Sequence, residues 1–338
     1  MSEDRYSRQV RFSGIGESGQ QKLVEASVLL VGCGGLGTVL ADMLGRAGIG
    51  KLHIIDRDYV ELSNLQRQML FTTADATERL PKAAAARDRL ALINPEITVE
   101  ATIGEFSAAC ADELVADASL VIDGTDNLGT RYLINDACVA AGKPWIYGAA
   151  VGSSGMAMSI TPGASPCFRC IFPEAPRAGS AQTCDTAGVL SPILHQVAAQ
   201  QATLAFQLLT GDHGQTGQLF QFDCWTGQFD RLDLRTAKNP ECVCCGLRNF
   251  EHLDAVARET TTSLCGRNAI QIAPATPDAV DLAALAERLR RSGRVTENPY
   301  LLSFAGDGVS FTVFRDGRAV VHETTDAVVA RGIRDRYV

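Results

Sequence analysis

A glycine-rich segment between two apolar stretches constrains the fold of this 338-residue chain most strongly. Residues Val28–Val31 are all apolar, and a second apolar stretch ends in Asp56. Between them the glycines fit the spacing G-x-G-x-x-G, with one additional glycine: Gly32, Gly34, Gly35 and Gly37. This order predicts a buried strand, a tight turn, a helix that begins near Gly35 and a second parallel strand. The segment therefore predicts a βαβ unit that binds a nucleotide.

The chemistry of this unit follows from its backbone. Glycine lets the chain turn tightly and approach a phosphate closely, and the start of the helix directs amide groups toward the same place. Asp56, at the end of the second strand, can accept hydrogen bonds from ribose hydroxyls. NAD-dependent oxidoreductases use the same arrangement, so the glycine pattern alone leaves the nucleotide open.

Strands and helices alternate through about residue 150. Residues 97–103 alternate between apolar and polar side chains and are predicted to form a strand, as are the mainly apolar stretches at 119–123 and 145–149. Helical segments separate these strands. Such alternation is typical of an α/β fold with a doubly wound, mostly parallel sheet, whose ligands bind at the carboxyl ends of the strands. Asp56 and Asp126 both lie at or just after such ends. We therefore expect them to face one pocket.

The rest of the chain predicts three regions. Residues 1–248 form the nucleotide-binding domain, residues 249–263 read as a polar linker, and residues 264–338 form a small α+β domain without a recognisable catalytic set. A long apolar helix at 190–209 suits a buried face or a subunit contact. Residues 72–80 lack clear periodicity and are expected to be a mobile loop.

Composition excludes several classes of function. With 46% hydrophobic and 21% charged residues, the chain can bury a full core. Its net charge of −8 disfavours binding to nucleic acid or to an anionic membrane. The polar N-terminus lacks an apolar signal segment, and no apolar run approaches the ~18 residues of a membrane span. A cytoplasmic protein is expected.

Four of the eleven cysteines form two C-x-x-C pairs, namely Cys167 with Cys170 and Cys242 with Cys245. Four thiolates suffice for a closed, tetrahedral structural zinc site that joins two distant segments. A redox-active pair is the less favoured alternative, because neither pair follows a strand and opens a helix. Cys244 competes for the fourth ligand position, but the x-x spacing favours Cys245.

Several polar residues follow Asp56 in an order that suits phosphate binding. In a doubly wound sheet they can converge on the glycine loop and supply cations for phosphates and a carboxylate for magnesium: Asn64, Arg67, Gln68, Lys82 and Asp126. Individually, Lys82 and Arg67 could be surface charges and Asp126 a turn residue. Hydride transfer needs fewer phosphate-directed groups, so their joint order disfavours an oxidoreductase.

At residues 3–248 the chain resembles the ThiF/MoeB/HesA family, which is related to ubiquitin-activating enzymes. The resemblance depends on motifs that occur in unbroken order: Arg5-Tyr-Ser-Arg8-Gln9, the glycine loop, Asp56 to Gln68, Pro81-Lys82, Asp123 to Asn127, Cys184 and the paired cysteines. It implies an enzyme that adenylates the C-terminal glycine carboxylate of a small ubiquitin-like sulfur-carrier protein with ATP and Mg²⁺.

The resemblance also implies roles for individual residues. Asp56 would bind the ribose, Asp126 the magnesium, and Arg8 would reach the site of the neighbouring subunit in a homodimer as an arginine finger. The implied nucleotide-binding set is Gly32, Gly34, Gly35, Gly37, Asp56, Asp58, Asn64, Arg67, Gln68, Lys82, Asp126 and Asn127. No general base is needed, because the attacking carboxylate is already ionised.

Three matters stay open at this point. Cys184 either takes part in sulfur transfer, for which a sulfur donor would be a further partner, or is an idle surface thiol. The pathway that the carrier serves is undetermined. Beside adenylation, two classes compete: an NAD-dependent oxidoreductase and a non-catalytic, zinc-stabilised interaction protein.

Overall fold

The computed structural model describes residues 5–174, 184–254, 259–264, 268–274 and 279–338. The chain forms two compact units. The first comprises Met1–Thr77 and Pro81–Ala255, and the second comprises Glu78–Leu80 and Val256–Val338. Among the described residues, no helix has the length and apolar character that crossing a membrane requires.

The first unit is built on an eight-stranded sheet in the order β3-β2-β1-β4-β5-β6-β7-β8. The first five strands along the chain pair in parallel, and β6 to β8 continue the sheet in antiparallel fashion. The strands are β1 (Ser27–Val31), β2 (Lys51–Asp56), β3 (Thr98–Ile103), β4 (Leu120–Asp123), β5 (Trp145–Val151), β6 (Ser154–Ile160), β7 (Gln218–Asp223) and β8 (Gln228–Asp233). The predicted doubly wound α/β fold is confirmed.

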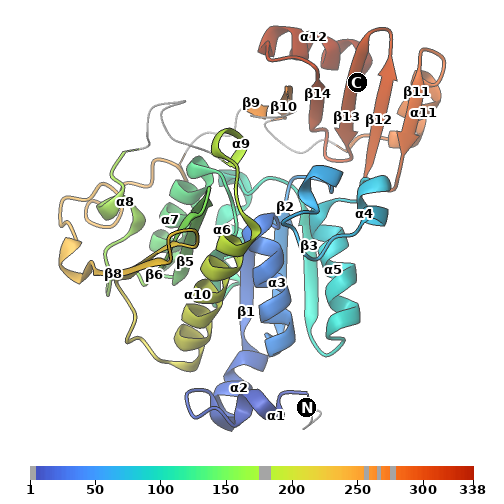
Figure 1. Cartoon of the computed structure of the whole chain (residues 1–338). Coiled ribbons are helices and arrows are strands. Elements are labelled where there is room, and N and C mark those ends of the chain that lie inside the picture. The colour runs from blue at the N-terminus through green and yellow to red at the C-terminus, as the bar shows by residue number, and fades with distance from the viewer. Residues whose placement is uncertain (1–4, 175–183, 255–258, 265–267, 275–278) are drawn as a thin grey trace. The chain divides into compact units, whose positions relative to one another are not determined.

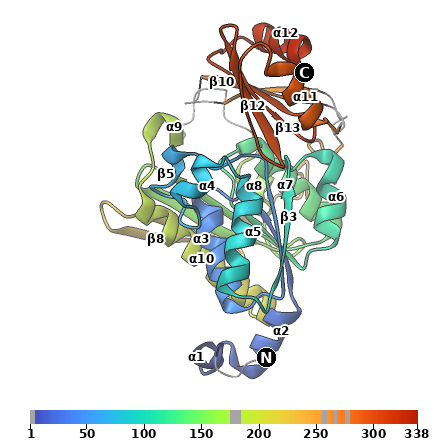
Figure 2. The ribbon, with the colours of Figure 1, turned by 90° about the vertical axis from the view of Figure 1, so that its right-hand side faces the viewer.

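Helices cover both faces of this sheet, as Figures 1 and 2 show, with α3, α5 and α10 on one face and α6 and α7 on the other. Consequently Val28, Leu29 and Leu30 of β1 are all buried, whichever face they point to. The helices are α1 (Ser7–Val10), α2 (Gly16–Glu25), α3 (Gly35–Ala47), η1 (Leu62–Asn64), α4 (Thr73–Thr77), α5 (Lys82–Ile93), α6 (Ala108–Ala116), α7 (Leu128–Ala141), α8 (Phe168–Ile171), α9 (Cys184–Ala187), α10 (Ser191–Thr210) and η2 (Arg235–Ala237).

Part of the segment expected to be a mobile loop is a short helix, α4. Asp75 Oδ2 accepts hydrogen bonds from Thr72 N at 2.7 Å and Thr72 Oγ1 at 2.8 Å, and Asp75 N donates back to Thr72 Oγ1 at 3.5 Å. This reciprocal pair caps the first turn. The expectation of a loop was wrong over α4, because one turn of helix is too short to show periodicity.

The second unit contains an antiparallel six-stranded sheet in the order β11-β12-β13-β14-β10-β9. Its described residues also include two helices. Ile272, Phe304 and Phe311 form its core with Leu285 and Tyr337 from the helices. The strand β9 begins within the stretch that the sequence suggests is a linker. The elements are β9 (Thr260–Leu264), β10 (Ala269–Ala273), α11 (Leu282–Leu289), β11 (Arg294–Glu297), β12 (Leu301–Gly306), β13 (Val309–Phe314), β14 (Ala319–His322) and α12 (Ala327–Tyr337).

Candidate functional site

The glycine loop is held by direct backbone packing. Gly32 follows β1 with φ of +90°, a left-handed conformation that favours glycine. A Cβ atom on Gly37 would lie 2.0 Å from the Gly32 carbonyl oxygen, and one on Gly124 would lie 2.5 Å from that same oxygen. The loop, the start of α3 and the end of β4 can therefore come together only with glycine at these positions.

Gly34, in contrast, has room for a side chain and is not packed against backbone. Within 4 Å, a Cβ atom there would meet only Gln68 Nε2, at 3.8 Å, among the described residues. Gln68 is 3% exposed, and its Oε1 atom has no hydrogen-bond partner in the described part of the chain. A buried, unsatisfied amide beside an open glycine marks a polar cradle that a ligand can complete. The residues present thus fit a nucleotide.

Asp56 is fixed next to this cradle at the end of β2. Its Oδ2 atom accepts a hydrogen bond from Cys33 N at 2.6 Å, and its Oδ1 atom accepts one from Asp58 N at 2.7 Å. Burial raises the pKa of Asp56, while the nearby charge of Lys82 acts in the opposite direction. The carboxylate is therefore pre-oriented where a ribose would be recognised.

Lys82 is a buried cation at the start of α5. It is 4% exposed, its Nζ atom lies 3.0 Å from Asp58 Oδ2, and its backbone N–H donates to the Asp58 carbonyl at 2.9 Å. Pro81 forms a β-bridge with Tyr59 just before it. The lysine and the positive end of the α5 dipole both favour an anion at this position.

The loop after β4 is organised by a buried ion pair. Asp123 is fully buried, and its Oδ2 atom lies 2.8 Å from Arg131 Nε. Arg131 Nη2 also donates to the carbonyls of Thr125 and Gly148, at 2.7 and 2.9 Å. Sequence reasoning assigned no role to Arg131. The signal was present, because an arginine in the first turns of the helix that follows can fold back onto an aspartate at a strand end.

This network sets the path of the chain toward Asp126. Asp126 is exposed. Burial, the largest single influence, lowers the pKa of Arg57, but the charges of Asp58 and Glu105, and less strongly that of Asp126, raise it above its ordinary value. Asn127 caps α7 by accepting a hydrogen bond from Thr130 N at 3.1 Å. The ends of β2 and β4 thus place carboxylates near one another, as the strand order predicts.

Other predicted residues have contacts of a different kind. Arg67 Nη1 donates to the Ser63 carbonyl at 3.1 Å, within its own turn. Asn64 is buried, and its Oδ1 atom accepts from Glu61 N at 3.1 Å. Cys184 begins α9, but its side chain lies outside the described residues.

Arg8 lies at the opposite end of α3 from the glycine loop. Its neighbour Gln9 donates to the carbonyl of Ala47, the last residue of α3, at 2.9 Å. The glycine loop precedes the first residue of that 13-residue helix, whose length is about 20 Å at ~1.5 Å per residue. Arg8 therefore does not contribute to the pocket of its own chain.

The four predicted cysteine ligands come together although they belong to distant segments. The Sγ atoms of Cys167, Cys170, Cys242 and Cys245 all lie within 4.8 Å of one another. Cys167 and Cys242 are 3.6 Å apart, and Cys170 and Cys245 are 3.4 Å apart. The S–S distance in a tetrahedral zinc–thiolate site is about 3.8 Å, so the cluster is compatible with zinc. Cys244 instead accepts a hydrogen bond from Asn135 Nδ2 at 3.1 Å.

A doubly wound sheet with an open glycine loop, an oriented carboxylate and a buried lysine defines a nucleotide-binding protein. Comparison with known proteins identifies the family. Residues 6–244 match the ThiF family. The chain is 44% identical over 335 residues to the sulfur carrier protein ThiS adenylyltransferase of Bacillus subtilis, with 99% of both chains covered.

Two further similarities agree. The sulfur carrier protein ThiS adenylyltransferase of Escherichia coli is 42% identical over 248 residues, which cover 73% of this chain and 96% of the relative. The structure of E. coli MccB with ATP has a similar fold, with a TM-score of 0.62 at 22% identity over 72% of this chain and 74% of that one. The chain belongs to the ThiF family, which confirms the resemblance drawn from its motifs, and it is an adenylyltransferase.

Proposed function

We propose that this protein uses ATP and Mg²⁺ to adenylate the C-terminal glycine carboxylate of a small ubiquitin-like sulfur-carrier protein. The names of its relatives support this class of partner. The observation that carries the proposal is the buried amide oxygen of Gln68, which lies beside Gly34 and has no hydrogen-bond partner among the described residues, together with the oriented carboxylate of Asp56 at the same loop.

Each residue of the pocket then has a role that its position supports. Asp56 binds the ribose, and Lys82 at the N-terminus of α5 binds the phosphates. Asn64 and Arg67 are expected to turn toward the phosphates when ATP binds. Asp126, exposed at the end of the loop after β4, is the residue that would hold Mg²⁺, a cation that prefers carboxylate oxygens.

The reaction brings two anions together. A carboxylate oxygen of the carrier forms a bond to the α-phosphorus while the bond from that phosphorus to the bridging oxygen breaks, and pyrophosphate leaves with the electron pair. Lys82 and Arg67 would neutralise charge on the phosphates, and the pocket would hold the nucleophile in line. Cys184 and an external sulfur donor would act only after the adenylate has formed.

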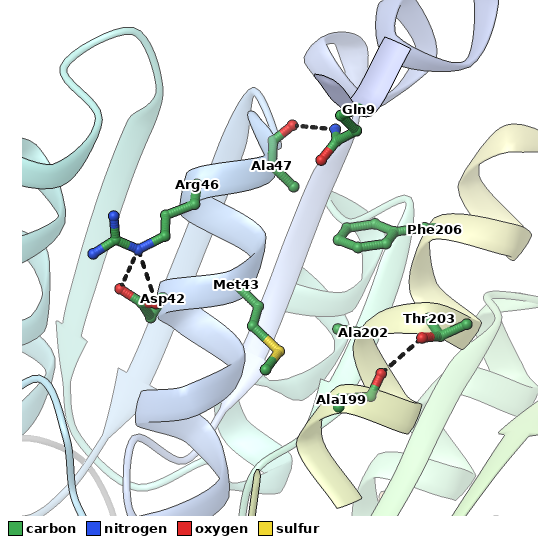
Figure 3. A pocket seen from close by; sticks show the side chains of 9 residues that line it. All are labelled: Gln9, Asp42, Met43, Arg46, Ala47, Ala199, Ala202, Thr203 and Phe206. Atoms are coloured by element: carbon green, nitrogen blue, oxygen red, sulfur yellow. Dashed lines mark hydrogen bonds and ion pairs between the residues drawn. The ribbon is translucent and has the colours of Figure 1, made fainter. Parts of the chain in front are cut away.

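The position of Arg8 supports a homodimer. Since Arg8 lies about one helix length from its own glycine loop, it can assist catalysis only in the site of a second copy. Beside it, α1, α3 and α10 line a groove of about 410 Å³, shown in Figure 3. The groove has an apolar middle, including Met43 and Phe206. We propose that a second copy of the chain covers this groove.

Subunit mixing tests the dimer and the arginine finger together. Arg8→Ala and Asp126→Ala proteins should each be inactive, but their mixture should contain heterodimers with one site that has both residues. Mixing Arg8→Ala with an Arg8→Ala/Asp126→Ala double variant is the matched control and should regain nothing. Verified subunit exchange without recovered activity would show that Arg8 acts in its own subunit or not at all, and the assignment of Arg8 as a finger from the neighbouring subunit would be wrong.

The four-cysteine cluster is proposed to bind one structural zinc ion. All four protein ligands are cysteines, which leaves no open position for water or substrate. The ion would join the segment around α8 to the segment after η2 and would supply stability rather than chemistry.

The central experiment is carrier-dependent exchange between pyrophosphate and ATP. We expect exchange with a glycine-terminated ubiquitin-like carrier and none with the same carrier lacking its final glycine. Asp126→Ala should abolish exchange while the melting curve stays unchanged, because Asp126 is exposed. Asp112→Ala, which removes another exposed aspartate from α6, is the control. Near-normal exchange by Asp126→Ala would disprove its role.

A further inference from the structure

The helix α1 carries Arg8 but is too short to hold its own position. It has four residues, and a helix of one turn has little stability by itself, because its first turn costs more conformational entropy than its hydrogen bond returns. Arg8 is exposed, whereas Tyr6 and Gln9 on either side of it are attached to the body of the first unit. The direction in which Arg8 points therefore depends on these two attachments.

Tyr6 anchors the chain just before α1. It is 5% exposed, and its hydroxyl oxygen accepts a hydrogen bond from Nδ2 of the fully buried Asn94 at 2.8 Å. Asn94 Nδ2 also donates to the carbonyl of Gly45 in α3, at 2.7 Å. The tyrosine ring packs on Gly48, where a Cβ atom would lie 2.6 Å from two ring carbon atoms. Tyr6 thus fits closely against the glycine that ends α3.

Gln9 anchors α1 on the other side of Arg8. Its Nε2 atom donates to the carbonyl of Ala47 at 2.9 Å and to Oε1 of Gln20 at 2.6 Å. Gln20 is 1% exposed, and its own Nε2 donates to the same Ala47 carbonyl at 3.0 Å. Figure 3 shows the hydrogen bond from Gln9 to Ala47. Both amide hydrogens of Gln9 are used, so the orientation of its side chain is fixed.

Both anchors use the C-terminal end of α3, where helix carbonyls lack partners within the helix. The two anchors are also joined to each other across Arg8, because Val10 N donates to the Tyr6 carbonyl at 2.9 Å. The backbone that carries Arg8 is thus attached before and after this residue. Only the side chain of Arg8 is left to move.

We propose that Tyr6 and Gln9 are positioning residues, which hold Arg8 in the direction in which it reaches the site of a second copy of the chain. This role rests on the proposed adenylation and on the proposed arginine finger. Misplacing a catalytic group by about 1 Å can cost on the order of 100-fold in rate. Two side chains of one subunit therefore control the rate of the reaction in the pocket of the other.

Gln9→Ala in the full chain is the first variant. It removes the donor to Ala47 and Gln20 but leaves the pocket of its own chain unchanged. We expect kcat of pyrophosphate exchange to fall about tenfold, with the KM for ATP within about twofold. Gln21→Ala is the matched control, because Gln21 Nε2 donates to Glu25 Oε1 of its own helix, at 2.7 Å. It should leave both constants unchanged.

Subunit mixing shows in which subunit Gln9 acts. In a heterodimer, the Asp126→Ala subunit supplies Arg8, and the Arg8→Ala subunit supplies the intact pocket. Gln9→Ala added to the Asp126→Ala subunit should lower the recovered exchange about tenfold. The same change added to the Arg8→Ala subunit should alter it by less than about twofold, because Gln9 acts only through Arg8. A merely structural role of Gln9 would lower recovered activity equally in both arrangements.

Tyr6→Phe tests the other anchor. Phenylalanine keeps the ring on Gly48 but removes the hydroxyl that Asn94 holds. We expect the same asymmetry between the two arrangements, with a smaller loss of about threefold, because half of the attachment remains. This variant also substitutes for Gln9→Ala if that protein does not fold.

The outcomes separate the positioning role from the proposals beneath it. Wild-type protein without carrier-dependent exchange would overturn the proposed reaction and the positioning role with it. If the wild type is active but verified heterodimers of Arg8→Ala and Asp126→Ala are not, the arginine finger and its positioning are wrong and adenylation stands. Equal losses in both arrangements, or no loss from either Gln9→Ala or Tyr6→Phe, would overturn the positioning role alone.

Discussion

The glycine-loop pocket and the four-cysteine cluster are built in opposite ways. The glycine loop is formed by backbone on backbone, with Gly37 and Gly124 packed against the Gly32 carbonyl, whereas a Cβ atom on Gly34 would meet only the Gln68 side chain among the described residues. The cluster is formed by side chains alone, and its four sulfur atoms come from two segments far apart in sequence. The glycine loop is thus shaped by the chain itself, whereas the cluster would be completed by the proposed zinc ion.

This difference separates chemistry from stability. A change at Gly34 should affect ATP binding and leave the fold intact, whereas a change at the packed glycines Gly37 and Gly124 should destabilise the fold. A change in the cluster should lower stability first and affect activity only as a consequence. The predictions below test this separation, from the largest expected effect to the smallest.

The packed and the unpacked positions of the glycine loop can be compared by replacing glycine with alanine at Gly37 and at Gly34. Gly37→Ala places a Cβ 2.0 Å from the Gly32 carbonyl oxygen, so neither backbone can stay in place. We expect a loss of about 5 kcal/mol in the free energy of unfolding, in the range reserved for severe steric defects. Gly34→Ala should keep the wild-type denaturation midpoint but raise the KM for ATP. Equal stability of the two variants would show that the loop is not packed as described.

Loss of a cysteine ligand should have a smaller but still large effect. Cys242→Ser removes one thiolate from the cluster, and a strong chelator should have a similar effect on the wild type. A decrease in Tm on the order of 10 °C is expected, equivalent to about 3–4 kcal/mol for a unit of this size. Metal analysis should give one zinc per wild-type chain. Protein without zinc that melts at the same temperature as zinc-loaded protein would contradict a structural ion.

Lys82→Ala should lower the rate of pyrophosphate exchange. Removal of a single positioned group that stabilises transition-state charge typically costs about 100-fold in rate, or about 2.7 kcal/mol, and we expect that loss in pyrophosphate exchange. The charge of Lys82 also opposes the burial that raises the pKa of Asp56. Without it, that pKa should rise further, so ATP binding that needs ionised Asp56 should be lost at a higher pH than in the wild type. An unchanged acid limb would show that the two groups are uncoupled.

The sequence predicts only part of the glycine-loop site and of the four-cysteine cluster. Glycine spacing and strand order place Asp56 and Asp126 correctly at the carboxyl edge, because parallel strands all end on one side. Cysteine spacing similarly brings Cys167 and Cys242 together. Neither pattern reveals the buried ion pair of Asp123 and Arg131. A contact between the end of a strand and the helix that follows it has no fixed sequence spacing by which it could be recognised.

The second unit is predicted less completely from the sequence than the first. Most of its strands and helices are visible as apolar patterns, but β9 lies almost wholly in the stretch predicted as a linker, and the polar strand β11 was not predicted. Nothing in the sequence indicates that Glu78–Leu80 packs with this unit. That association depends on the amide of Asn298 and on the left-handed backbone of Arg79, both of which are properties of the tertiary structure.

The smallest effect is expected at Cys244, the buried cysteine beside the cluster. Its Sγ atom accepts a hydrogen bond from Asn135 Nδ2, and Asn135 Oδ1 accepts one from Phe168 N at 2.9 Å. Cys244→Ala should leave the Asn135 donor unsatisfied and cost about 1 kcal/mol, while zinc content stays at one per chain. Cys244→Ser, which keeps an acceptor, should cost less. The comparison with Cys242→Ser is decisive, because both substitutions remove one buried thiol from the same short segment. If Cys244→Ala loses zinc and stability to the same extent, Cys244 is a ligand and Cys245 is not.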